Sequence, residues 1–178
     1  MQRIAIALLF IGVIIFDGCS SGSKEPVGTT NAPAAPAQQP VIDFRDQDGR
    51  TELMRTVETG TADDVKQKID AGANVNAQSI TGITALMTAA GMGKTDTVRL
   101  LLAKGADVNA KAQGGFTALM QAALAGRTEV AEILLEAGAD PKAEDMTGKS
   151  AADWADEKNH KEIVQMIVRR GGRQPKRR

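Results

Sequence analysis

The sequence predicts an all-α solenoid, in which about four helix pairs of 33 residues each stack behind an N-terminal leader and linker. Two sets of residues recur at this period: Gly49, Gly82, Gly115 and Gly148, and Thr51, Thr84, Thr117 and Ser150. Such regular self-similarity is the signature of a repeat architecture. Aromatic residues make up only 3% of the chain, which favours closely packed helices over a sheet.

Each repeat is expected to contain two helices with defined ends. The recurring hydroxyl residues can cap the first helix, because their side chains accept from its free backbone N–H groups. Gly72, Gly105 and Gly138 follow the second helix, where a left-handed residue ends a helix at no steric cost. Val98 and Leu101 share one face of the second helix, as do Val130 and Leu134. A single repeat cannot bury such a face alone, so neighbouring repeats must stack.

Short motifs at both ends of the repeats identify a family resemblance. The openings read GRTELMRTVETG, GITALMTAAGMG, GFTALMQAALAG and GKSAADWADEKN, and the endings of the first three repeats read AGANVNA, KGADVNA and AGADPKA. These motifs resemble those of ankyrin repeats over roughly Asp46 to Val168. The resemblance implies a β-turn followed by a helix-turn-helix in each repeat, and a role in binding another protein without catalysis. The usual His of the opening is Met54, Met87, Met120 and Asp153 here, which shifts stability toward apolar packing.

The repeats are expected near residues 46–78, 79–111, 112–144 and 145–170, within a domain that covers residues 42–170. The first repeat carries Gln67 and Lys68 where the second carries Leu100 and Leu101, so the outer repeats are expected to cap the stack. Residues 171–178 are expected to form a basic, disordered tail.

Residues 1–18 are expected to be a signal peptide of the lipoprotein type. An apolar run from Ile4 to Phe16 follows Arg3, and it is shorter than the roughly 20 residues that span a bilayer. The run ends in FDGC, which resembles a bacterial lipobox and implies cleavage before Cys19 and lipidation of that residue. Ordinary cleavage near Gly18, or an uncleaved membrane-proximal helix, is the alternative. Ser20 resembles the residue of outer-membrane lipoproteins, so we expect anchoring in the outer membrane, facing the periplasm.

Residues 19–41 are expected to be a disordered tether between this anchor and the repeats. The segment is rich in Ser, Gly, Ala, Gln and Pro and contains almost no large apolar residues. It therefore cannot bury enough surface to offset the entropy of ordering it.

The composition disfavours several kinds of chemistry. Cys19 is the only cysteine and His160 the only histidine, so no Cys/His zinc cluster can form and no cofactor or metal is expected. His160 occupies a structural turn position of the family and lacks an activated nucleophile beside it, so no catalytic residue is expected. Without the leader and the tail the domain is mildly acidic, which disfavours nucleic acid. Met54, Met87 and Met120 could suggest copper binding, but core packing fits their spacing better.

The candidate partner-binding surface follows from the resemblance, because partners of the family usually meet the turn tips and the exposed ends of the first helices. The corresponding apolar residues are Ile80, Ile83, Met92, Phe116 and Leu124. Charged residues flank them, with Asp48, Arg50 and Glu58 on one side and Lys149, Glu157 and Lys158 on the other. An apolar centre with a polar rim is typical of a protein interface. The alternative is that these side chains only pack between repeats. Trp154 is expected to seal the core near the end of the stack.

The sequence thus predicts a monomeric protein-binding module in the bacterial cell envelope. One alternative function is an immunity or inhibitor protein for a periplasmic or secreted enzyme. Another is a structural lipoprotein that contacts the cell wall or lipids through its basic tail.

Overall fold

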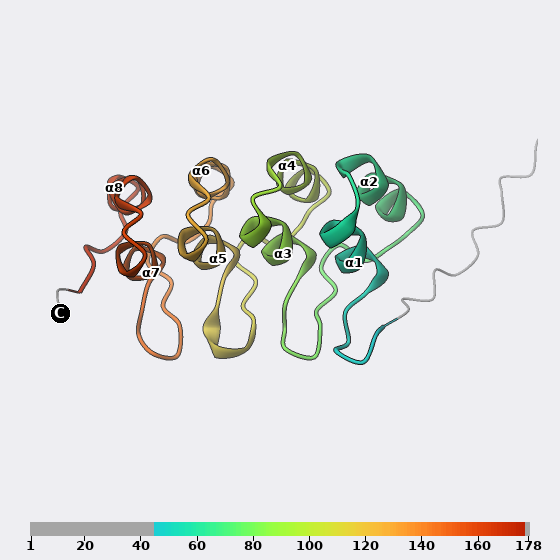
Figure 1. Cartoon of the computed structure of the whole chain (residues 1–178), viewed down its shortest axis with the longest axis horizontal. Helices are drawn as coiled ribbons and strands as arrows, with labels where there is room; N and C mark the ends of the chain where they lie inside the picture. The colour runs from blue at the N-terminus through green and yellow to red at the C-terminus, as the bar shows by residue number, and fades with distance from the viewer. Residues whose placement is uncertain (1–44, 177–178) are drawn as a thin grey trace, which may run out of the picture. The chain divides into compact units, whose positions relative to one another are not determined.

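The computed structural model describes residues 45–176, which form four helix pairs standing side by side in chain order (Figure 1). The first helices of the pairs are α1 (Glu52–Thr59), α3 (Ala85–Met92), α5 (Ala118–Leu124) and α7 (Ala151–Glu157). The second helices are α2 (Ala62–Asp70), α4 (Thr95–Ala103), α6 (Thr128–Glu136) and α8 (Lys161–Arg169). We number the repeats 1 to 4 by these pairs. The predicted leader, tether and lipidation site at Cys19 lie outside the described residues.

A loop precedes the first helix of each repeat, and the four loops project together from one side of the helix layers (Figure 1). Neighbouring loops are joined by backbone hydrogen bonds from Ile80 to Asp48, from Gln113 to Thr81 and from Met146 to Gly114, at 3.1, 2.8 and 2.7 Å. Gln113–Gly115 forms a single 3-10 turn, η1, in the third loop. Residues 45–176 contain isolated β-bridges but no strand, so the predicted all-α class is confirmed.

Helix ends follow the predicted pattern. The side chains of Thr51, Thr84 and Thr117 each accept a hydrogen bond at 3.3 Å from the backbone N–H three residues later, and Ser150 does the same at 3.4 Å. After the second helices, Gly72, Gly105 and Gly138 have φ values of 98°, 84° and 90°. Both the predicted caps and the predicted left-handed glycines are therefore confirmed.

The core runs through all four repeats between the two helix rows. Met54, Met87 and Met120 are at most 2% exposed, which confirms that the recurring methionines pack in the core. Among the second helices, Leu101 and Leu134 are fully buried. Contacts join each first helix to the next one along the stack, so each repeat covers the apolar face of its neighbour. None of the helices in residues 45–176 is long and apolar enough to cross a bilayer.

Asparagine side chains add polar links between repeats at the end of the second helices. Asn76 donates to the carbonyl oxygen of Gly105 at 3.0 Å and accepts from the N–H of Asp107 at 2.8 Å. One repeat later, Asn109 makes the same pair of bonds with Gly138 and Asp140, at 3.1 and 2.8 Å. The amide group suits this role because it both donates and accepts.

The prediction of a disordered tail from residue 171 onward is wrong for residues 171–176. The guanidinium of Arg173 donates to Asp153 at 2.9 Å, to the carbonyl oxygen of Gly148 at 3.2 Å, and to Glu144 at 2.5 Å. Lys176 donates from its backbone N–H to Asp153 and from its Nζ to Gly148, both at 2.7 Å. The tail lies against repeat 4 because that repeat offers these acceptors at its outer edge.

The cross-repeat role of asparagine predicts a difference between two equivalent loop positions. Asn109→Ala should lower the free energy of unfolding by about 1 kcal/mol, because it removes two hydrogen bonds between repeats 2 and 3. Lys142 occupies the same position one repeat later, and its exposed side chain makes no hydrogen bond in the described part of the chain. Lys142→Ala should therefore change stability by less than about 0.5 kcal/mol. Equal losses in urea unfolding would contradict the assigned role.

Candidate partner-binding groove

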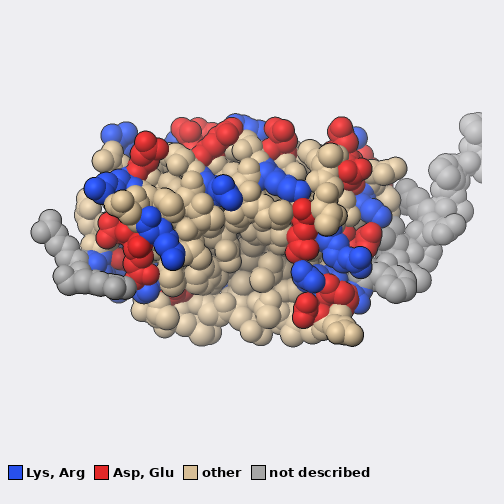
Figure 2. All heavy atoms as spheres, in the orientation of Figure 1, with Lys and Arg blue, Asp and Glu red and all other residues tan. Residues whose placement is uncertain are grey.

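The loops and the first helices together border a hollow on one face of the repeat domain. Figure 2 shows this hollow with uncharged residues in its middle and clusters of charged side chains at both ends. The middle belongs to repeats 2 and 3 and the ends to repeats 1 and 4, because the repeats follow one another along this face. We call this hollow the groove.

Two recurring positions explain this division. The first position lies just before each first helix and the second lies near its end. Repeat 2 has Ile83 at the first position and Gly91 at the second, and repeat 3 has Phe116 and Leu124. We call these four residues the groove floor. In repeats 1 and 4 the same positions hold ion pairs instead: Arg50 with Glu58 at 3.1 Å, and Lys149 with Glu157 at 2.8 Å. An uncharged centre thus lies between two salt-bridged ends.

At the repeat 1 end, Arg50 is held by three carboxylates. Its guanidinium lies 2.9 Å from Asp46, 3.1 Å from Glu58 and 3.5 Å from Asp48. The side-chain hydrogen bond and the charge of Asp46 raise the pKa of Arg50. Backbone and side-chain hydrogen bonds from Arg50 lower the pKa of Asp46 against the opposing effect of desolvation. The three carboxylates therefore hold the Arg50 guanidinium in one position at the edge of the groove.

At the repeat 4 end, Trp154 packs against the core, as predicted, and its half-buried side chain also lines the groove wall. Its half-buried ring lies 5.2 Å from that of Phe116 at an interplanar angle of 52°. The indole Nε1 donates to Asp145 at 2.9 Å, and the Nζ of Lys149 lies 4.2 Å from the ring centroid. These contacts fix the orientation of the ring beside the groove.

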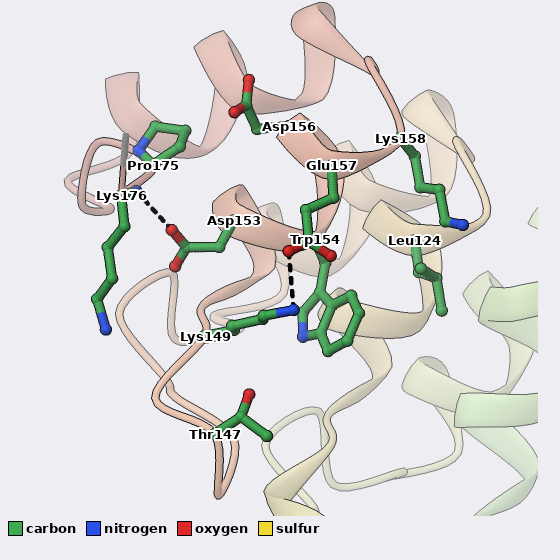
Figure 3. Close-up of a pocket in the computed structure, with 10 residues that line it drawn as sticks. All are labelled: Leu124, Thr147, Lys149, Asp153, Trp154, Asp156, Glu157, Lys158, Pro175 and Lys176. Carbon is green, nitrogen blue, oxygen red and sulfur yellow. Dashed lines mark hydrogen bonds and ion pairs between the residues drawn. The ribbon is translucent and has the colours of Figure 1, made fainter. Parts of the chain in front are cut away.

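A pocket of about 640 Å³ opens beside Trp154 (Figure 3). Of the predicted partner-binding residues, Leu124 and Lys149 line this pocket, and Phe116 packs against the indole ring. Glu157 and Lys158, which belong with Lys149 to the predicted charged flank, line it as well. The sequence did not place the remaining lining residues at the binding surface, and these are Thr147, Asp153, Trp154, Asp156, Pro175 and Lys176. Trp154 could have been found from the repeat register, because Arg55, Thr88 and Gln121 occupy its position in the other repeats and are not core residues.

Asp153 fixes the tail as one wall of this pocket. Its buried carboxylate accepts from the N–H and the hydroxyl of Ser150, both at 2.7 Å, as well as from Arg173 and Lys176. Burial acts to raise the pKa of Asp153, but these hydrogen bonds outweigh it and lower the pKa from 3.8 to about 2. The carboxylate is consequently ionised at neutral pH and has no oxygen without a partner.

The other predicted site residues lie apart from the pocket. Ile80 is 67% exposed in the second loop, and Met92 is 42% exposed at the end of α3. Ile83 is half-buried on the groove floor, and Arg50 lies three repeats away from Trp154. The predicted residues therefore fall into a C-terminal cluster of Phe116, Leu124 and Lys149 and more dispersed positions along the groove.

His160 has a structural position in the described fold. It precedes α8, and its ring fills the space above Gly126 in repeat 3. Lys94 and Arg127 occupy the same position in repeats 2 and 3. Within residues 45–176, no group of three or more His, Cys, Asp or Glu side chains could hold a metal ion.

Comparison with known proteins agrees with the repeat geometry. A family model described as ankyrin repeats, in three copies, matches residues 53–145 and again residues 115–178. The two overlapping matches span all four first helices except the start of α1, and they cover more than half of the chain. A search of curated proteins finds no match.

The low pKa of Asp153 predicts an acid-sensitive C-terminal end. Because ionised Asp153 stabilises the fold, its contribution should be complete above about pH 4 and lost as the pH falls toward 2. Asp153→Asn should lower the free energy of unfolding at pH 7 by about 2 kcal/mol. In this variant the free energy of unfolding should also fall less between about pH 4 and pH 2 than in wild type, because residue 153 no longer becomes protonated.

Asp156→Asn is the matched control, because Asp156 is exposed on the same helix. Urea unfolding between pH 2 and pH 7 compares the three proteins. The account of Asp153 is wrong if Asp153→Asn and wild type lose stability in parallel over this range.

Proposed function

Because the chain belongs to the ankyrin-repeat family, whose repeats generally mediate protein–protein interaction, we propose that the groove binds a partner protein. The observation that carries this proposal is the pattern of the groove floor. Repeats 2 and 3 present Ile83, Phe116 and Leu124 around a bare Gly91, whereas repeats 1 and 4 present ion pairs at the same positions. An apolar centre with a polar rim is the usual anatomy of a protein interface.

Shape and energy both favour the groove over the outer surface. Gly91 lies in α3 without a side chain, and the space where its Cβ would stand has only Gln121 within 4 Å. A partner side chain can approach the backbone at this point. Each large apolar side chain that becomes fully buried contributes about 1.5–3 kcal/mol. The half-buried Ile83, Phe116 and Leu124 can contribute part of this when a partner covers them.

We further propose that the module works in the bacterial cell envelope, anchored through lipidated Cys19 in the outer membrane and facing the periplasm. The support is the sequence pattern of the leader, an apolar run that ends in FDGC. Lipid chains on one cysteine would provide the anchor, since each buried methylene contributes about 0.8 kcal/mol. The anchored module would then bind a periplasmic partner in the groove, and binding of this kind requires no catalytic residue.

A structural role through the basic tail has weaker support. Arg173 and Lys176 are two of the tail's basic residues, and both bind acceptors of repeat 4. The guanidinium of Arg173 is thereby paired with a carboxylate of the domain, whereas the Nζ of Lys176 meets a backbone carbonyl oxygen. The apolar side chains of the groove floor stay half-buried in the described structure, so part of their surface is open to a partner, which favours the groove as the binding surface.

The partner-binding role is tested by blocking the groove floor. A cross-linked pull-down from envelope extract should capture one protein with the wild-type chain and lose it with the double variant Ile83→Arg/Phe116→Arg. Two bulky cations on the apolar floor would leave charges without partners in the interface. This double variant, and the control variant described next, must keep the helical content of wild type as measured by circular dichroism.

The double variant Gln67→Arg/Gln165→Arg is the matched control. It adds the same charge at exposed positions of α2 and α8, away from the groove. It should retain the captured protein. Loss of that protein in both double variants, or in neither, would show that the groove floor is not the binding surface.

Lipidation is tested by Cys19→Ala. The variant should move from the membrane fraction to the soluble fraction and should not incorporate a labelled fatty acid, because the acceptor thiol is absent. Ser20→Ala keeps the cysteine and should remain membrane-bound. Membrane association that survives in Cys19→Ala would show that another segment anchors the chain.

A further inference from the structure

Basic side chains border the groove along one edge. In Figure 2 they lie directly above the hollow, while acidic side chains gather farther up and at the two ends. Lys94 and Arg127 immediately precede α4 and α6, and Lys158 follows α7. All three therefore lie at turns between the two helices of a repeat, on one edge of the stack. We call these residues the basic edge.

The basic edge is not neutralised by carboxylates among the described residues. The Nζ of Lys94 donates to the carbonyl oxygens of Glu58 and Gly60 at 3.1 and 2.9 Å. Arg127 donates from Nε to the carbonyl oxygen of Gly91 at 3.3 Å. These contacts place the two cations beside residues of the groove but leave their charges uncompensated.

Carboxylates on the groove are mostly engaged already. Glu58 and Glu157, which occupy equivalent positions in repeats 1 and 4, are paired with Arg50 and Lys149. In the pocket, the oxygens of Asp153 are occupied by Ser150, Arg173 and Lys176, and Asp156 is the one lining carboxylate without an ion pair in the described part of the chain. Away from the acidic repeat 1 end, the basic edge therefore offers a partner positive charges that no ion pair in the described part of the chain compensates.

The pocket combines this charge with an apolar wall. Trp154, Leu124 and Pro175 supply apolar surface, and Lys158 and Lys176 line the pocket on opposite sides of the indole (Figure 3). The Nζ of Lys176 is held by the carbonyl oxygen of Gly148 rather than by a carboxylate. A ligand that joins a large apolar group to carboxylates would satisfy both features at once.

We infer that the partner inserts an acidic segment that carries a large apolar side chain. The apolar side chain occupies the pocket beside Trp154, and neighbouring carboxylates face Lys158 and Lys176, with Arg127 and Lys94 farther along the edge. This inference rests on the proposed function and adds the chemistry of the partner. Charge complementarity of this kind speeds association and selects against basic partners, and its contribution falls as salt rises.

Trp154 offers a direct readout, because the chain has one tryptophan and no tyrosine. We would titrate the full chain with three synthetic peptides of equal length, which alternate Glu with Phe, Lys with Phe, and Glu with Ala. The Glu/Phe peptide should shift the emission of Trp154 and bind best of the three. Its affinity should fall about tenfold between about 0.01 M and 0.15 M salt. Equal or tighter binding of the Lys/Phe peptide would overturn the inference.

Lys158→Glu supplies the second test. Reversing this charge in the pocket lining should weaken binding of the Glu/Phe peptide about tenfold at low salt. Lys142→Glu is the matched control, because Lys142 is an exposed lysine in the loop after α6, away from the pocket. It should bind as wild type does. The inference fails if Lys158→Glu also binds as wild type does.

Two further outcomes separate this inference from other possibilities. Vesicles of anionic phospholipid, without peptide, should leave the Trp154 emission unchanged; the same shift with vesicles alone would assign the basic edge to a lipid surface instead. If the pull-down captures a protein through the groove floor but the Glu/Phe peptide does not bind, the partner chemistry is wrong and the protein-binding function stands. Failure of that pull-down removes the function on which the inference rests.

Discussion

Every feature of the repeat domain depends on the stacking of helix pairs that cannot bury their own apolar faces. Leucines and methionines such as Leu86, Leu119 and Met120 are at most 1% exposed and belong to one core cluster that continues from repeat to repeat. Stacking makes the fold quasi-one-dimensional, since each repeat contacts only the adjacent ones. The outer faces of the first and last repeats have no neighbouring repeat in the described structure to cover them. Repeat 1 presents polar side chains on α2, and repeat 4 is covered in part by residues 171–176.

Stacking also determines how this fold can encode a binding surface. Because the register is fixed, equivalent positions of all repeats line the same groove, and binding chemistry can vary only through the residues at those positions. Here the positions of Ile83 and Phe116 hold Arg50 and Lys149 in the outer repeats, where each forms an ion pair. The residue types at the helix-capping and core positions change little among the same four repeats. The proposed binding positions can therefore vary while the capping and core positions keep the repeats stacked.

The fold could be predicted from sequence because its determinants are local and repeated. Three kinds of residue recur every 33 residues: the helix caps, the left-handed glycines and the buried methionines. The caps, for example, are Thr51, Thr84, Thr117 and Ser150. The cross-repeat bonds of Asn76 and Asn109 recur in the same way, so their periodicity was visible, but the role of the amides needed the geometry of two neighbouring repeats.

The candidate site was less accessible to sequence analysis, for two physical reasons. Trp154 was assigned only to the core by its hydrophobicity, although its repeat position belongs to polar residues elsewhere. Arg173 was recognisable only as part of the basic tail, and its contacts were not predictable, because Asp107 and Asp140 occupy the equivalent position in earlier repeats. Its contact with Asp153 exists only because no helix pair among the described residues covers the outer edge of repeat 4.

The most direct test of the account is site-specific photo-cross-linking in living cells. A photoreactive amino acid replaces Phe116 on the groove floor or, in a second strain, Glu132 on the exposed face of α6. If the groove binds a partner protein, irradiation should produce a discrete protein adduct at position 116 and none at position 132. An adduct at position 132 alone, or none at position 116, would contradict the claim that this groove is where the protein acts.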